Sequence, residues 1–297
     1  MLGRFSKDAG SLLGVEIACD SVRMLQLQQR RGGCRVLSWA LQALDTPLRD
    51  DWYRDPAPLL KALRSAYQRS GSRQRQVALA LPGSEVICKV SQLPSALSAS
   101  QMEDHLLTQA EHLFPFKLED LAMDFHVQGD SGQSNGQVDV LVAACRQRSL
   151  DVLEQLLEDA GLEVAAVEVD SIALLRLMPA LAGQGLLRIE PSGATLHAWS
   201  APGLPQRQAA RFASVDSPSQ QLERVVQLVA NGSLPDTRQL QLIVEDAEAA
   251  AWLERLPPRL GMPCMQLTPA QDFIEGQSPG CDGRMALAYG LALGGCK

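Results

Sequence analysis

The chain has 297 residues, a formal net charge of -7 and a pI near 5.2, and 46% of its residues are hydrophobic. This length can supply a large core and favours two domains, and the composition is ordinary for a globular protein. Nucleic-acid binding requires a basic face. The nearest candidate, residues 68–76, reads as a solvated helix end and loop, so we expect no nucleic-acid partner.

Cysteine usage and hydropathy indicate where the chain works. Its seven cysteines form no Cys-x-x-Cys pair and several lie in apolar runs, which disfavours metal binding or a disulfide framework and fits reducing surroundings. The N-terminal residues have no signal-peptide pattern, and no stretch approaches the roughly 18 apolar residues that span a membrane. The sequence contains no Gly-x-Ser-x-Gly motif, which argues against a serine hydrolase. We therefore expect a cytoplasmic chain that inserts into no membrane itself.

The first 82 residues predict a small α/β unit. Residues 12–28 read as a strand, a tight turn at Cys19-Asp20-Ser21 and a second strand, with Glu16 before the turn and Arg23 after it. A third strand is expected near residues 35–41. A helix follows, with prolines at its start and Gly71 at its end, and residues 76–82 predict a buried strand.

Residues 83–161 predict a compact insertion with the order β-α-β-β-α. Its last helix is expected to begin at Ser149 as N-cap and to stop at Gly161. At Asp170-Ser171 a strand gives way to a helix, which favours a helix cap over a cleft acid. The apolar positions of the first inserted helix recur at the helical period and predict its inward face: Met102, Leu106, Leu107, Ala110 and Leu113.

The second half repeats the first pattern. Residues 185–200 predict another strand-turn-strand, about 170 residues after the first, and Ser217-Pro218 predict a helix start. A strand, a helix, a short strand and a C-terminal helix of small residues follow. The expected organisation is a first core half at 1–82 with part of 162–184 returning to it, an inserted subdomain at 83–161, a truncated second half at 185–284 and a C-terminal helix at 285–297.

Several segments carry a family resemblance. They are LLGVEIACDSVRMLQL, ALPGSEVICKVSQLP, AEHLFPFKLEDLAMDFHV, the long run from VDVLVAAC to DSIALLRL, and ALAYGLALGG near the C-terminus. In this order they resemble the PilM family, cytoplasmic actin-like proteins of type IV pilus assembly that are related to the division protein FtsA. The resemblance is strong over residues 12–177 and faint beyond them. It implies an actin/FtsA-like α/β fold, a duplicated ribonuclease H-like core with an inserted subdomain. The second-half helical subdomain is expected to be reduced or missing.

The resemblance also implies a partner. In the family, the cytoplasmic N-terminal tail of a bitopic inner-membrane protein, PilN, docks in a groove between the first core half and the inserted subdomain. Pro82, Gly83 and Ser84 mark the crossing into that subdomain and are expected near the groove. Arg146 is either a tail contact or an ordinary surface arginine after a strand.

The family binds ATP between its two halves, which assigns candidate nucleotide residues here. They are Glu16, Cys19, Asp20, Ser21, Arg23 and Gly193, with Glu16 near a metal-bound water or paired with Arg23. Three departures weaken this site. Pro191 takes the place of an acidic residue, Glu245-Asp246 replace two glycines, and the connection after Trp199 is short. Two carboxylates beside a polyanion add bulk and repulsion.

These observations favour a non-catalytic scaffold of type IV pilus assembly. It would bind a PilN-like tail and contact other pilus components, peripheral at the inner membrane, with no cofactor and with ATP binding weak or lost. The alternative is an actin-like switch or weak ATPase that uses ATP and Mg²⁺. A sugar-kinase-like enzyme would require a catalytic Asp and two intact phosphate hairpins, and neither is convincing.

Overall fold

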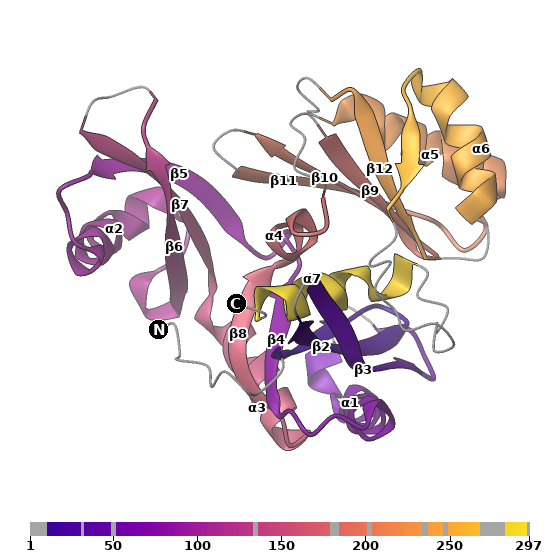
Figure 1. Cartoon of the computed structure of the whole chain (residues 1–297), viewed down its shortest axis with the longest axis horizontal. Coiled ribbons are helices and arrows are strands. Elements are labelled where there is room, and N and C mark those ends of the chain that lie inside the picture. The colour runs from indigo at the N-terminus through magenta and orange to yellow at the C-terminus, as the bar shows by residue number, and fades with distance from the viewer. Residues whose placement is uncertain are drawn as a thin grey trace.

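The computed structural model describes residues 11–30, 33–48, 52–132, 136–178, 184–200, 204–232, 237–245, 249–267 and 283–295. Figure 1 shows three groups of elements: two five-stranded sheets with their helices, and a smaller three-stranded unit to one side. The chain therefore has the two-part core with an insertion that its sequence predicts.

The first sheet has the strand order β3-β2-β1-β4-β8. Strands β1, β2 and β3 form an antiparallel meander, and β4 and β8 continue the sheet parallel to β1. The 3-10 turn η1 (Trp52–Arg54) precedes α1. The bounds are β1 (Leu13–Ile17), β2 (Ser21–Arg30), β3 (Gly33–Ala43), α1 (Ala57–Ser70), β4 (Gln76–Leu81) and β8 (Glu163–Val169).

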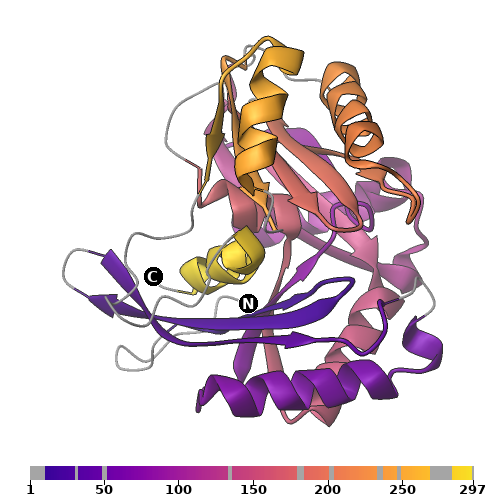
Figure 2. The same ribbon diagram turned by 90° about the vertical axis from the view of Figure 1, so that its right-hand side faces the viewer.

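Helices cover both faces of this sheet. On one face α1 and α3 (Gln147–Asp159) pack on a core that includes Val15, Met24 and Leu79. On the other face lies the C-terminal helix α7 (Ala286–Gly294), whose residues also contact Leu186 and Ile243 of the second half. Figure 2 shows α7, in yellow, between the first sheet and the second half. It is therefore a shared layer of both halves.

The second sheet repeats the strand order of the first, as β11-β10-β9-β12-β13. Its core holds apolar residues of α5 and α6, among them Val225 and Trp252. The Ser217 side chain accepts a hydrogen bond from the Gln220 amide, so the expected helix start is confirmed. Strand β11 has no counterpart in the sequence prediction. The bounds are β9 (Gln184–Glu190), β10 (Gly193–Ser200), β11 (Leu204–Arg211), α5 (Pro218–Asn231), β12 (Gln239–Val244), α6 (Ala249–Leu260) and β13 (Cys264–Gln266).

The inserted unit is a three-stranded sheet, β5-β7-β6, with one helix. Its core gathers Met102, Leu106, Phe114 and the inward valines of β7. Leu107, expected to point inward, is instead exposed, because the buried stripe follows only the i, i+4, i+8 positions 102, 106 and 110. The bounds are β5 (Ile87–Pro94), α2 (Ala99–Leu113), η2 (Leu118–Asp120), β6 (Leu121–Asp130) and β7 (Gln137–Arg146).

Helix α3 departs from its expected place in two ways. It begins at Gln147 with Arg146 as N-cap, so Ser149 lies inside the helix and the predicted cap is wrong. Its buried residues Leu156 and Leu157 belong to the core of the first half. Helix α2 therefore supplies the helical part of the inserted unit's core, whereas α3 packs mainly on the first half and also touches β6, β7 and η2.

The short helix α4 (Asp170–Leu175) follows β8 and packs against α7. A 3-10 turn, η3 (Gly283–Met285), leads into α7. None of the helices that the structure describes is long and apolar enough to cross a membrane.

Candidate functional site: the cleft between the halves and the groove beside it

Two hairpin turns meet at the interface between the halves. The β1–β2 turn carries Cys19, and the β9–β10 turn carries Ser192. The Cys19 Sγ and Ser192 Oγ atoms lie 3.2 Å apart and share a hydrogen bond. Burial raises the pKa of the Cys19 thiol, so the group is a neutral partner at pH 7. The turns that would hold phosphates from either side are thus in direct contact.

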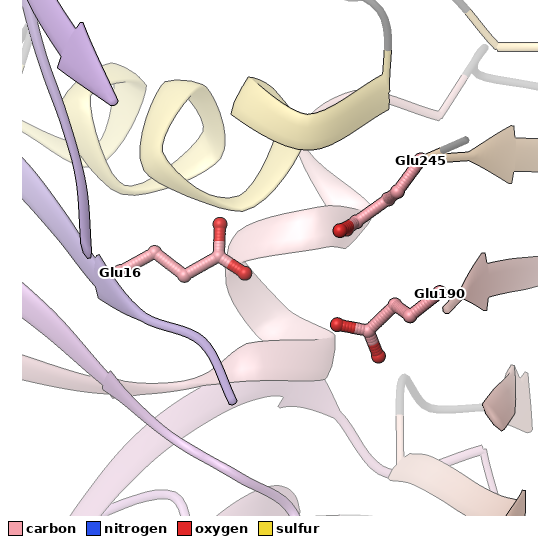
Figure 3. Close-up of side chains that lie close together, drawn as sticks. All are labelled: Glu16, Glu190 and Glu245. Atoms are coloured by element: carbon pink, nitrogen blue, oxygen red, sulfur yellow. The ribbon is translucent and has the colours of Figure 1, made fainter. Parts of the chain in front are cut away.

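Three glutamates converge behind these turns. Glu16 comes from β1, while Glu190 ends β9 and Glu245 follows β12. Figure 3 shows the three side chains pointing toward one another from the two halves, and their carboxylate oxygens lie within 4.8 Å of one another. Such a cluster requires positive charge nearby.

Two buried arginines supply that charge. Arg23 from β2 lies 3.4 Å from Glu16 Oε1, 3.2 Å from Asp20 Oδ1 and 2.7 Å from Glu245 Oε2. Arg188 from β9 donates to Glu245 over 2.6 Å and pairs with Glu16 at hydrogen-bonding contact. Its Nη2 also lies 3.5 Å from Glu190. Each arginine contacts carboxylates of both halves.

Burial and neighbours set the protonation states of this cluster. Burial opposes the charge of Arg23, but Glu16 and Glu245 raise its pKa above the ordinary value, and the same balance holds the pKa of Arg188 high. Burial raises the pKa of Glu245 to about 7, against the lowering influence of Arg188 and Arg23. Since four carboxylates, those of Glu16, Asp20, Glu190 and Glu245, face two guanidinium groups, a proton on Glu245 would reduce the excess of negative charge.

Several of the residues implied for ATP and Mg²⁺ have partners within the chain itself. Ser21 Oγ donates to Asp20 and accepts from Arg23 Nε, so its polar atoms are engaged within the hairpin. Gly193 is explained without a nucleotide, because a Cβ at that position would lie 2.4 Å from the Ala210 carbonyl oxygen of β11. Pro191 in the facing turn has no backbone donor to offer. Asp246 lies outside the described residues.

Asp170 links three parts of the molecule. Its Oδ1 accepts from the Gly83 amide at 3.0 Å and from the Ser171 amide at 2.6 Å, and its Oδ2 lies 3.2 Å from Arg207 Nε of β11. Val169 is the N-cap of α4, so the helix-cap interpretation of Asp170 is wrong. The carboxylate instead ties the crossing into the inserted unit to the second half.

His197 of β10 lies beside this link and is fully buried. Its Nδ1 is 2.8 Å from Ser171 Oγ, and its ring stacks on Trp199. Burial lowers the pKa of His197 to about 4, with Arg207 and Arg188 acting in the same direction against Asp170. The imidazole is therefore neutral at pH 7. Its sequence context, a lone histidine in a strand, gave no sign of this position.

A groove of about 800 Å³ opens between the first half and the start of the inserted unit. Most of its lining residues are apolar, and three of them are charged and exposed: Glu85, Arg146 and Arg148. Its other lining residues come from β1 and its turn, from the segment between β3 and η1, from η1, from the end of β4 and the residue after it, and from α3: Ile17, Cys19, Leu48, Trp52, Tyr53, Ala80, Leu81, Pro82, Ser149, Val152 and Leu153.

The structure treats the four expected partner residues differently. Pro82 and Arg146 line the groove, whereas Gly83 and Ser84 are not among its lining residues. Arg146 Nη1 lies 3.0 Å from Asp120 Oδ2, and its guanidinium lies 5.2 Å from the centre of the Phe116 ring. The sequence did not single out Tyr53 or Val152, because residues of η1 and α3 meet there only after folding.

Sequence reasoning also missed Arg188. A signal was present, since LLRIE places one cation in an apolar strand just as SVRML does for Arg23. A lone charge in such a run requires a buried counter-charge. The identity of that partner depends on tertiary structure.

Known structures share this fold. A PilM-PilN type IV pilus biogenesis complex matches with a TM-score of 0.75 at 18% identity, over 97% of this chain and 99% of that one. The cytoplasmic domain of EpsL, an inner membrane component of the type II secretion system of Vibrio cholerae, matches with a TM-score of 0.53 at 15% identity, over 96% and 95%. EutJ, an ethanolamine utilization protein from Carboxydothermus hydrogenoformans, matches with a TM-score of 0.55 at 11% identity, over 96% of this chain and 89% of that one. These matches confirm the actin-like fold.

The sequence profile of type IV pilus assembly protein PilM matches residues 14–185. That span covers more than half of the chain, including the first core half, the inserted unit and the junction with the second half. The chain belongs to the PilM family of type IV pilus assembly proteins.

Proposed function

We propose that this protein is a non-catalytic scaffold whose groove binds the cytoplasmic N-terminal tail of a PilN-like inner-membrane protein. The observation that carries the proposal is the groove of about 800 Å³ between the first half and the inserted unit. Partner binding there would place the protein at the inner membrane. Other pilus assembly components would attach to the remaining surface.

The lining of the groove supports an extended peptide as occupant. Tyr53 and Val152 are large apolar side chains that are about half exposed, and both face this groove. A mostly apolar lining with a few charged groups is typical of grooves that take a few side-chain anchors and orient the peptide by polar contacts. A bitopic partner would present such an extended segment on the cytoplasmic side.

The same proposal includes weak or absent ATP binding. Contact between Cys19 and Ser192 and the buried carboxylates of Glu16 and Glu245 support it, because a triphosphate requires donors and space at this place. No cofactor is then required for the scaffold. The second candidate, an ATP-dependent switch or weak ATPase, is favoured only by the shared actin-like fold.

Isothermal titration calorimetry tests the proposal. The probe is a synthetic peptide of the N-terminal cytoplasmic segment of the PilN-like protein of the same bacterium. We expect saturable binding without nucleotide, and a dissociation constant that stays within about twofold when millimolar Mg-ATP is added. Peptide binding that requires Mg-ATP would instead establish the switch, and absence of binding under both conditions would refute tail recognition.

A further inference from the structure

We propose that the two halves are held together by an ionic clasp made of the chain's own side chains, in place of a bound nucleotide. The clasp consists of Arg23, Arg188, Glu16 and Glu245. It gives roles within the chain to Glu16 and Arg23, two of the residues implied for ATP. It does not depend on what occupies the groove.

The ion pairs cross the cleft in both directions. Arg23 of the first half lies 2.7 Å from Glu245 Oε2 of the second half, and Arg188 of the second half pairs with Glu16 of the first. Each half thus contributes one arginine and one glutamate. Separation of the halves would leave each arginine without one of its carboxylates, so the ion pairs themselves oppose opening.

The clasp is anchored to the backbone on each side. Arg23 Nη1 donates to the Arg284 carbonyl oxygen at 2.9 Å, in the turn that leads into α7. The Glu245 amide donates to the Ile189 carbonyl oxygen at 2.9 Å, which joins the ends of β12 and β9. Fixed ends reduce the side-chain entropy that ion pairs normally cost.

Burial makes these contacts strong. The four side chains are at most 7% exposed, so water screens them little. Buried charges carry a large desolvation cost that well-placed partners must offset. Removal of one partner leaves the other charge buried and uncompensated. An opened cleft would return all four groups to water, and the balance between the two states depends on this geometry.

A cation bound by Glu16, Glu190 and Glu245 is the competing explanation for their convergence. Arg188 already contacts all three carboxylates, and Arg23 contacts Glu16 and Glu245. A divalent ion at the centre would meet two guanidinium groups at close range and be repelled. The arginines take the position that such an ion would require.

A second link extends the closed interface. Arg207 of β11 lies 3.2 Å from Asp170 at the start of α4, and Trp199 Nε1 donates to the Ser171 carbonyl oxygen at 3.2 Å. These contacts join the second half to α4, on the first-half side. Among the described residues, these contacts add to the clasp, to the Cys19–Ser192 hydrogen bond and to the shared helix α7.

Pulsed electron paramagnetic resonance tests the clasp on the full chain. Spin labels on non-natural residues replace Gln68 on α1 and Glu254 on α6, both exposed and in different halves. We expect one narrow distance peak without nucleotide, unchanged by millimolar Mg-ATP. A broad distribution in the wild type, or one that sharpens only with Mg-ATP, would overturn the proposal, and this measurement requires no mutant to fold.

Two variants then probe the pairs. Arg188→Ala, or the near-isosteric Glu16→Gln if the first is poorly folded, should shift or broaden the distance peak. Arg259→Ala is the matched control, because Arg259 pairs at 2.5 Å with Glu223 within the second half. A control variant that broadens the peak as much as Arg188→Ala, or clasp variants that leave it unchanged, would also overturn the proposal.

Discussion

Arg188 on β9 and Glu16 on β1 form an ion pair although 172 residues separate them in the chain. Both side chains are buried, and they belong to different halves of an actin-like fold. In the resemblance that the sequence carries, this is where a nucleotide binds. Here an ion pair between two side chains of the same chain takes that position.

The two residues should be thermodynamically coupled. Arg188→Met leaves Glu16 buried without its main partner and should lower the free energy of unfolding by roughly 3 kcal/mol. Glu16→Gln should cost less, because the amide keeps its shape and still accepts a hydrogen bond. In urea unfolding, the double variant should cost less than the two single costs added, by about 1 kcal/mol or more. Strict additivity would show that the pair is not an energetic unit.

Stability should depend on pH through His197. Burial lowers the pKa of His197 to about 4 from 6.5, so the unfolded chain binds more protons between these values and the folded state loses stability as pH falls from 6.5 to 4. His197→Gln should remove this loss. Over that window, the change in the free energy of unfolding per pH unit, measured by urea unfolding, should therefore be less positive for the variant than for the wild type, and equal slopes would contradict the assignment.

Glu245 changes the pH dependence of stability in the opposite direction, so its contribution must be measured apart from that of His197. Its pKa is raised to about 7 from 4.5, so the folded state binds more protons in that window and loses stability as pH rises through it. Glu245→Gln mimics the protonated form and should abolish this part of the slope. The difference in slope between each variant and the wild type gives the contribution of the substituted side chain.

The groove should be sensitive to charge on its apolar lining. Val152→Asp places a carboxylate at an apolar lining position and should weaken binding of the tail peptide by at least about tenfold, equivalent to ~1.4 kcal/mol. Val127→Asp is the matched control, because both valines are 40% exposed and Val127 lies on β6, away from the groove lining. Equal losses in the two variants, measured by calorimetry, would argue against the groove.

Gly193 should be required for folding and not for a ligand. A Cβ there would lie 2.4 Å from the Ala210 carbonyl oxygen, so Gly193→Val should cost about 2 kcal/mol or more, because β10 and β11 must move apart. Gly132→Ala is a suitable control, since nothing lies within 4 Å of its Cβ. Circular dichroism on heating gives both values. A Gly193→Val variant as stable as the wild type would restore the ligand explanation.

Much of the fold follows from the sequence, because its signals are local. The helix start at Ser217 and the stop of α1 at Gly71 depend on residues a few positions apart. The order of elements then yields the duplicated architecture with its insertion. Ser149 shows the limit of such signals. It is a good capping residue, yet the helix begins earlier, at Gln147, and Ser149 lies inside it.

The contents of the cleft and of the groove were decided by tertiary structure. The sequence placed Glu16 and Arg23 at a hairpin and Glu245 after a strand, and the repulsion expected of Glu245 assumed a polyanion beside it. The fold instead brings Arg188 to that carboxylate, and α3 to the groove beside Tyr53 and Val152. A local pattern shows which residues require a partner, because a charged residue within an apolar strand sequence indicates a buried charge. Which partner they meet depends on how two sheets, far apart in sequence, close on each other.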